Sequence, residues 1–207
     1  MQEITNVLGT SVAEFMKKPW KDRKNVYRDA LTADGFLLKL DPGVQDEEEE
    51  LLGPALLLLK RDVTGNKRLS EEAQRIYYSH NAFRVRAPWL REFFGRRHRE
   101  DGHFDPRLWV RRLSIMLYRD DEDEEEEQGV VAKTLQFLMK CDRLRDVTFE
   151  IKDSGREGDE LLADLLNSTQ PSLQELDRRL ERGVMVIREK AVHDMGGYLE
   201  PEVVPLP

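Results

Sequence analysis

Strand-like segments recur along this chain at similar intervals, and this feature most restricts the folds that it can adopt. They are centred near residues 84, 115, 149 and 186, so neighbouring centres lie 31, 34 and 37 residues apart. Each gap contains loop residues and apolar residues spaced as in a helix. A gap of this length can hold one crossover helix between parallel strands. We therefore expect an α/β protein built from a short stack of βα units, with an α+β arrangement left open.

The first part of the chain has a helical pattern instead. Apolar residues from Ile4 to Met16 have the spacing of one helix, although Gly9 weakens its middle. Pro19 is well placed to start a second helix, because proline is tolerated in a first helical turn, and this helix continues through Leu31. The chain is therefore expected to begin with a helical region that precedes the βα units.

Local signals predict the remaining elements. Phe36 to Leu40 is an apolar run closed by turn residues, which indicates a short strand. Ser70 is a good N-cap for a helix that extends to about Ser79. We expect a strand from Trp109 to Tyr118 with Trp109 on its apolar face, and a Pro-rich tail that packs as an extended strap or frays. Further helices are expected at 55–63, 88–94, 130–139 and 161–180.

Two acidic runs divide the chain and dominate its charge. Residues 46–50 contribute five acids and residues 120–127 contribute eight, so the net charge of −8 would become +5 without these thirteen. Runs of like charge repel themselves and stay solvated, which favours loops over an acidic binding patch. The expected organisation is a helical region, an acidic loop, a βα domain with an acidic insertion at 120–128, and a tail, at 1–45, 46–53, 54–195 and 196–207.

Cysteine content and apolar runs indicate a compartment. Cys141 is the single cysteine, so an internal disulfide cannot form, and its apolar helical surroundings predict a buried packing role. The first residues lack the features of a signal peptide, and the longest apolar run, Pro54 to Leu59, is too short to span a bilayer. We expect an intracellular protein, cytoplasmic or nuclear, with no membrane partner.

Four short motifs, in this order along the chain, resemble the F-box-like domain proteins of filamentous fungi. The first is a helix that follows a proline: Pro19, Arg23, Asn25, Val26, Tyr27, Ala30 and Leu31. The second is a Pro-Ala-Leu-Leu segment: Pro54, Ala55, Leu56 and Leu57. The third is Glu72, Ala73, Tyr77, Tyr78, Ser79, Asn81, Phe83 and Val85, and the fourth is Val110, Leu113 and Ile115. The resemblance extends from about Phe15 to Ile151.

This resemblance implies a protein-interaction module. In the better-understood relatives, such helices dock on the adaptor subunit of a cullin-RING ubiquitin ligase. The residues expected to contact a partner are Trp20, Val26, Tyr27 and Leu31. Val26, Tyr27 and Leu31 either form the docking face or the seam between the helical region and the βα part. Trp20 stands where the family usually has a smaller residue.

A second, shorter resemblance lies in the βα part. One segment is similar to a leucine-rich repeat, and its repeat positions hold Leu135, Leu138, Cys141, Leu144, Val147 and Phe149. A single repeat does not make a solenoid, because such units need neighbours to bury their faces. This resemblance therefore supports a short βα stack and nothing larger.

No motif in the sequence indicates an enzyme. The four histidines, His80, His98, His103 and His193, lie among basic or loop residues without the spacing of a zinc site, so we expect no metal. There is no Gly-rich phosphate loop, no nucleophile elbow and no histidine paired with Cys141. We therefore expect no cofactor and no catalytic residue.

The arginine-rich segment from residue 84 to residue 112 gives an alternative function. Arginines interleaved with aromatic residues are typical of surfaces that bind nucleic acid by phosphate contacts and base stacking. The candidates for nucleic-acid binding are Arg91, Arg96, Arg97, Arg99, Arg111 and Arg112. The aromatic residues between them also fit core positions, so a structural role is favoured. The preferred interpretation is a non-enzymatic protein–protein interaction module.

Overall fold

The computed structural model describes most of the chain and divides it into two compact units. The described residues are 2–33, 37–40, 52–95, 104–117, 130–153, 161–192, 197–198 and 201–204. Unit 1 comprises Met1–Phe83 and Glu92–Arg111, and unit 2 comprises Arg84–Arg91 and Arg112–Pro207. The boundaries differ from the expected ones, because residues 54–83 belong with the N-terminal helices and not with the βα domain.

Unit 1 begins with two short helices where one was expected. Helix α1 spans Gln2–Leu8 and helix α2 spans Val12–Lys17. Gly9 separates them with a φ of 68°, in the left-handed region that glycine adopts most easily. Ser11 then caps α2, its side chain accepting a hydrogen bond from the Glu14 amide at 3.3 Å. The prediction of one helix is wrong because the helical spacing continues across a backbone break.

Helix α3, Trp20–Leu31, follows Pro19 as predicted and packs against helix α6, Lys67–His80. The buried Asn81 side chain joins the ends of the two helices. Its amide donates to the Leu31 carbonyl at 2.8 Å, and its oxygen accepts from the Ala33 amide at 2.9 Å. These bonds satisfy backbone groups that a helix end leaves without an intrahelical partner.

The start of α6 lies three residues before the predicted one. Asn66 is the N-cap, and its side-chain oxygen accepts from the Leu69 amide at 3.0 Å. Ser70 lies inside the helix, where its hydroxyl donates to the Lys67 carbonyl at 3.0 Å. The earlier start places Leu69 in the core with no exposed surface. The predicted cap at Ser70 is wrong because Asn66 supplies an equally good cap one turn earlier.

The other elements of unit 1 are short. The predicted strand is present as β1, Leu37–Leu40. The helix expected at 55–63 is divided into a 3₁₀ helix, η1 Gly53–Leu59, and a short α-helix, α5 Arg61–Thr64. A second 3₁₀ helix is η4 Pro106–Leu108. Trp109 lies in a turn after η4, so the strand predicted from Trp109 begins only later, at Arg112.

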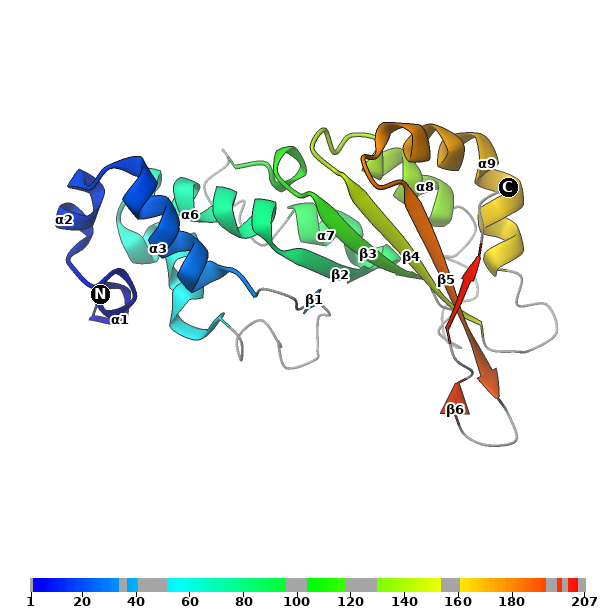
Figure 1. Cartoon of the computed structure of the whole chain (residues 1–207), viewed down its shortest axis with the longest axis horizontal. Helices are drawn as coiled ribbons and strands as arrows, with labels where there is room; N and C mark the ends of the chain where they lie inside the picture. The colour runs from blue at the N-terminus through cyan, green and yellow to red at the C-terminus, as the bar shows by residue number, and fades with distance from the viewer. Residues whose placement is uncertain are drawn as a thin grey trace. The chain divides into compact units, whose positions relative to one another are not determined.

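Parallel strands with intervening helices form unit 2, which confirms the α/β class (Figure 1). The first segment of unit 2 contains the end of β2, Ala82–Arg86, and the 3₁₀ helix η2, Ala87–Trp89. Helix α7, Leu90–Gly95, crosses the boundary between the units. The remaining bounds are β3 Arg112–Leu117, α8 Val130–Leu138, β4 Asp146–Asp153, α9 Leu161–Arg179, β5 Val184–Val192, β6 Gly197–Tyr198 and β7 Glu202–Val204. Strands β3, β4 and β5 pair in parallel, whereas β6 and β7 pair antiparallel with β5.

One face of these parallel strands carries the core of unit 2. In the register, Ile115 pairs with Phe149 and Phe149 with Val186, and all three side chains are fully buried. Helices α8 and α9 pack on each other and lie along the same side of the strands in Figure 1. Because successive side chains of a strand point to opposite faces, the residues between these three form a second, less covered face.

Two predictions for unit 2 are refined by the structure. Cys141 is buried, as expected, but it lies just after α8 and not inside a helix, with its amide donating to the Leu138 carbonyl at 2.9 Å. Residues 202–204 of the tail form β7, which pairs with β5, so this part of the tail is an extended strap. The acidic runs at 46–50 and 120–127 lie outside the described residues.

Candidate interaction surface

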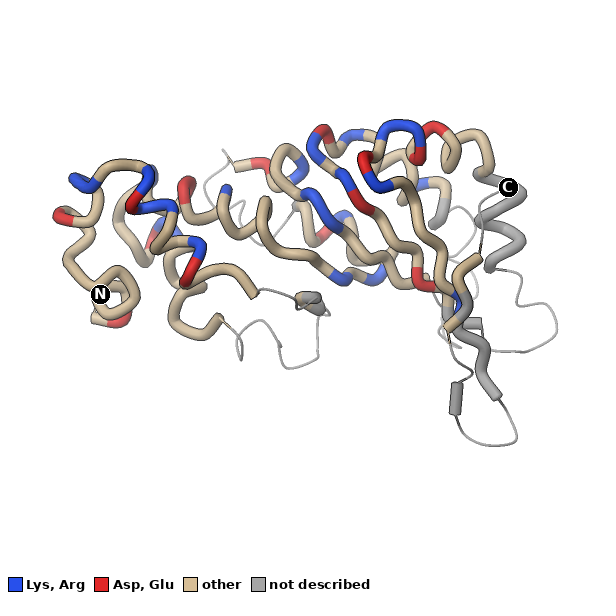
Figure 2. Tube along the Cα trace, viewed as in Figure 1, with Lys and Arg blue, Asp and Glu red and all other residues tan. Residues whose placement is uncertain are grey.

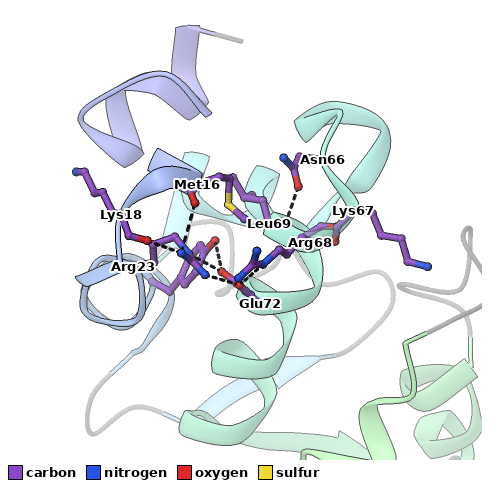
Figure 3. Close-up of polar contacts among 10 residues, drawn as sticks. Met16, Lys18, Arg23, Asn66, Lys67, Arg68, Leu69 and Glu72 are labelled. Carbon is purple, nitrogen blue, oxygen red and sulfur yellow. Dashed lines mark hydrogen bonds and ion pairs between the residues drawn. The ribbon is translucent and has the colours of Figure 1, made fainter. Parts of the chain in front are cut away.

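A buried ion pair connects α3 to α6 (Figure 3). Arg23 donates from Nε to one carboxylate oxygen of Glu72 at 2.9 Å and from Nη2 to the other at 2.7 Å. The side chains are only 4% and 10% exposed. A two-point contact of this kind fixes both the distance and the orientation of the partners.

Two further side chains complete this buried cluster. Arg68 donates from Nε to Glu72 at 3.0 Å, and the Tyr27 hydroxyl donates to it at 3.4 Å. Burial alone would raise the pKa of the Glu72 carboxyl, but the hydrogen bonds from Arg23 and Arg68 outweigh it and lower the pKa below its ordinary value. Burial raises the pKa of the Tyr27 hydroxyl, so this residue stays neutral. The cluster is a carboxylate held between two guanidinium groups.

Arg23 also fixes the segment that precedes its own helix. Its Nη1 donates to the Lys18 carbonyl at the end of α2, and Figure 3 shows Arg23 between this carbonyl and Glu72. The guanidinium lies 5.7 Å from the centre of the Trp20 ring, in a cation–π contact. The Tyr27 ring lies 6.4 Å from the same indole. Contacts with the buried side chains of Arg23 and Tyr27 therefore hold the first turn of α3 in place.

The four residues expected to contact a partner separate into core and surface. Tyr27 and Leu31 are fully buried inside unit 1, and Tyr27 packs edge-on against Phe15 with ring centres 5.4 Å apart. Val26 is half-buried. Trp20 remains 44% exposed, and it is the most exposed aromatic residue among those whose side-chain burial the structure describes. Of the four, only Trp20 presents a large apolar surface to solvent.

Basic residues lie beside Trp20 on the same helix. Lys24 and Arg28 follow it at intervals of four, and Lys21 is the next residue in the sequence. Lys21 and Arg28 are exposed and Lys24 is half-exposed. Figure 2 shows basic positions in blue along α3. We call Trp20, Lys21, Lys24 and Arg28 the α3 flank. The sequence analysis did not single out its three basic residues, although their spacing was visible in the sequence.

Of the six arginines proposed for nucleic-acid binding, three are described by the structure, and these belong to both units. Arg96, Arg97 and Arg99 lie outside the described residues. Arg111 is half-buried and belongs to unit 1, whereas the exposed Arg91 and Arg112 belong to unit 2.

The aromatic residues of the same segment have structural roles in unit 1. Phe93 and Phe94 are buried, with ring centres 4.7 Å apart. Trp109 is covered by the Arg75 guanidinium, which lies 5.1 Å from its ring centre. A base-stacking surface needs aromatic faces that are open to the bases, and these rings are occupied by other contacts.

The less covered face of the unit 2 strands carries a smaller polar cluster. Arg84 forms an ion pair with Glu150, whose other oxygen accepts a hydrogen bond from Ser114. Met185 and Val203 are 46% and 63% exposed. The sequence analysis missed this face because it depends on the register of strands that are far apart in the sequence.

The His80 ring is held by contacts at the end of α6. His80 is the last residue of that helix and half-buried. Its Nδ1 lies 3.1 Å from the Ile76 carbonyl, which can only accept, and 2.8 Å from the Ser79 hydroxyl. A proton on Nδ1 satisfies the carbonyl and leaves this nitrogen unable to take a proton from Ser79. Burial lowers the pKa of His80, and the nearby Lys24, Arg111 and Arg28 act in the same direction.

Neither a metal cluster, a membrane span nor a similar protein assigns a function to this chain. Within the described ranges, no three histidine, cysteine or acidic side chains gather as metal ligands. None of the helices in those ranges has the length and apolar character of a membrane span. No protein-family model, curated protein or solved structure matches this chain.

Proposed function

We propose that this chain is a non-enzymatic protein–protein interaction module that binds its partner through Trp20. One observation carries the proposal: Trp20 is 44% exposed although the residues beneath it are buried and fixed by hydrogen bonds. Tryptophan is among the residues that most often dominate binding energy at protein interfaces. A side chain that is already held in place loses little conformational entropy when a partner covers it.

The resemblance to F-box-like proteins suggests the kind of partner. In this proposal, α3 is a degenerate F-box-type helix that docks on the adaptor subunit of a cullin-RING ligase. The helix starts at Pro19 as in that family, which supports the comparison. Because Tyr27 and Leu31 are buried in unit 1, the contact would be made by Trp20 and its exposed neighbours.

The exposed fraction of Trp20 provides a direct test with a matched control. Leu108 also belongs to unit 1 and is also 44% exposed, so Leu108→Ala removes a comparable apolar side chain elsewhere. We expect purified adaptor subunit to bind the wild-type chain, and Trp20→Ala to weaken binding by about tenfold or more, as for an interface hot spot. Leu108→Ala should leave the affinity within about twofold, as for a residue outside the interface.

Isothermal titration calorimetry measures the affinity of the adaptor for the wild-type chain, Trp20→Ala and Leu108→Ala. Circular dichroism checks that each variant is folded. Absence of adaptor binding by the wild-type chain would remove the adaptor as the partner. Equal affinity of the wild-type chain and Trp20→Ala would overturn the role of Trp20. A parallel titration with a single-stranded oligonucleotide tests the alternative function, which predicts an affinity that falls steeply as salt increases.

A further inference from the structure

We propose that the α3 flank binds an acidic peptide segment that carries an apolar side chain. The inference deepens the proposed function and rests on it, because it names the chemical class of the partner that Trp20 contacts. The apolar side chain would pack on the exposed indole, and the acidic residues would pair with Lys21, Lys24 and Arg28.

Helix geometry separates the charges of α3 by sign. Successive residues of an α-helix rotate by about 100°, so Lys24 lies about 40° and Arg28 about 80° from Trp20 around the axis. By the same count, Asp22 and Asp29 lie about 160° to 180° away, on the other side of the helix. Lys24 and Arg28 are therefore gathered beside Trp20, Lys21 lies about 100° from it, and the two acids of α3 lie on the far side of the helix.

Some other exposed basic residues of unit 1 have acidic partners. Lys17 pairs with Glu14 at 2.6 Å and Lys67 with Glu71 at 3.7 Å, both within one helix. Lys21, Lys24 and Arg28, in contrast, have no acidic partner among the described residues. The flank thus keeps positive charge that a partner can use, and acidic residues complement it.

The neighbourhood of the flank supports a positive potential. Burial is the main cause of the lowered pKa of His80, at the end of α6, and the charges of Lys24, Arg111 and Arg28 act in the same direction. Glu72 neutralises one of the two guanidinium groups that it binds, those of buried Arg23 and exposed Arg68. The positive potential therefore comes from the exposed residues, where it can guide an acidic partner toward Trp20.

A protein partner fits this surface better than a nucleic acid. Proteins that bind single strands stack successive bases on several aromatic faces. Trp20 is the one aromatic residue among the strongly exposed large apolar side chains of the described chain. One aromatic anchor beside three cations matches a peptide in which acidic residues surround a single apolar side chain.

Fluorescence polarisation with a labelled peptide tests this inference. The probe is a nine-residue peptide with Leu at its centre and Glu at the other positions, and the comparison peptide has Gln in place of every Glu. We expect the acidic peptide to bind and the Gln peptide to bind at least tenfold more weakly. Trp20→Ala and the double variant Lys24→Glu, Arg28→Glu should each lower the affinity for the acidic peptide at least tenfold.

The matched control changes the same amount of charge elsewhere. Lys133 and Lys140 are exposed residues of unit 2, so the double variant Lys133→Glu, Lys140→Glu should leave the affinity within twofold. Equal loss in the control double variant, or unchanged affinity in Trp20→Ala, would show a non-specific charge effect and overturn the inference. Tighter binding of a single-stranded oligonucleotide than of the acidic peptide would also overturn it.

The outcome can be separated from that of the proposed function. Adaptor binding that depends on Trp20, without binding of the acidic peptide, would overturn the inference and leave the proposed function intact. Binding of the acidic peptide that depends on Trp20, without adaptor binding, would support the inference and remove only the adaptor.

Discussion

The two units each contain an arginine–glutamate pair, but the pairs differ in burial and in the number of partners. In unit 1, Arg23 and Glu72 are 4% and 10% exposed, and Glu72 accepts further bonds from Arg68 and Tyr27. In unit 2, the side chains of Arg84 and Glu150 are 19% and 13% exposed. Glu150 accepts one additional bond, from Ser114, and Arg84 Nε is buried without a hydrogen bond in the described structure.

This difference reflects what holds each unit together. The strands of unit 2 are joined by a ladder of backbone hydrogen bonds and by buried apolar residues such as Phe149, so its ion pair adds to contacts that already hold the strands together. The helices α3 and α6 share no such ladder. A buried ion pair contributes little net stability on its own, but removing one partner leaves a charge without compensation. The stability of unit 1 should therefore depend on its ion pair far more than the stability of unit 2 depends on the Arg84–Glu150 pair.

The largest expected effect is that of Arg23→Ala. The change leaves the Glu72 carboxylate buried and removes the bond to the Lys18 carbonyl, so we expect a loss of about 3–5 kcal/mol in the free energy of unfolding. Urea unfolding measures the loss, and hydrogen exchange of α3 and α6 locates it in unit 1. Arg68→Ala is the control, because Arg68 binds the same carboxylate but its side chain is 69% exposed. Similar losses in both variants would contradict this interpretation.

A smaller effect is expected for Arg84→Ala in unit 2. Its ion pair is partly solvated, so we expect a loss of about 1–2 kcal/mol in the free energy of unfolding, seen in the exchange rates of β3 and β4. Arg145→Ala removes a pair whose side chains are 52% and 64% exposed, and it should cost less than about 1 kcal/mol. If Arg84→Ala destabilised its unit as much as Arg23→Ala does, burial would not be the property that distinguishes the two pairs.

The smallest expected effect is a change with pH. The pKa of Glu72 is lowered in the folded protein, so its stabilising contribution is complete above the unfolded-state pKa of about 4.3. That contribution is lost as the pH falls through the lower folded-state pKa. The difference in unfolding free energy between the wild-type chain and Glu72→Gln should therefore be constant from about pH 7 to 5 and shrink below about pH 4. Urea unfolding at several pH values measures it, and a constant difference down to about pH 3 would argue against a charged Glu72.

Periodic signals in the sequence predicted most elements but not all of their ends. The alternating pattern at Val147, Phe149 and Ile151 predicted β4, and Pro19 marked the start of α3. Two predictions were wrong: one continuous helix across Gly9, and a cap for α6 at Ser70. The spacing of apolar residues does not reveal a change in backbone direction. At α6, two good caps competed, and the position of Leu69 in the core favoured the earlier one.

The candidate site was predicted only in part. Among the α3 residues predicted to contact a partner, Trp20 is exposed, whereas Tyr27 and Leu31 are core residues. Arg23 and Glu72 are 49 residues apart, and each is an ordinary charged residue in its own segment. Nothing local shows that they meet, because their contact depends on how two helices pack.

By itself, the sequence determined the order of helices and strands, because hydrophobic periodicity and turn residues act over short distances. It also determined the angles between side chains around α3, since these follow from the helical repeat. Only the tertiary structure decided which side of α3 is buried. Several positions on that helix are apolar enough to be core, and the choice depends on contacts with α6 and Phe15. Those contacts bury Tyr27 and leave Trp20 at the surface, where a partner can reach it.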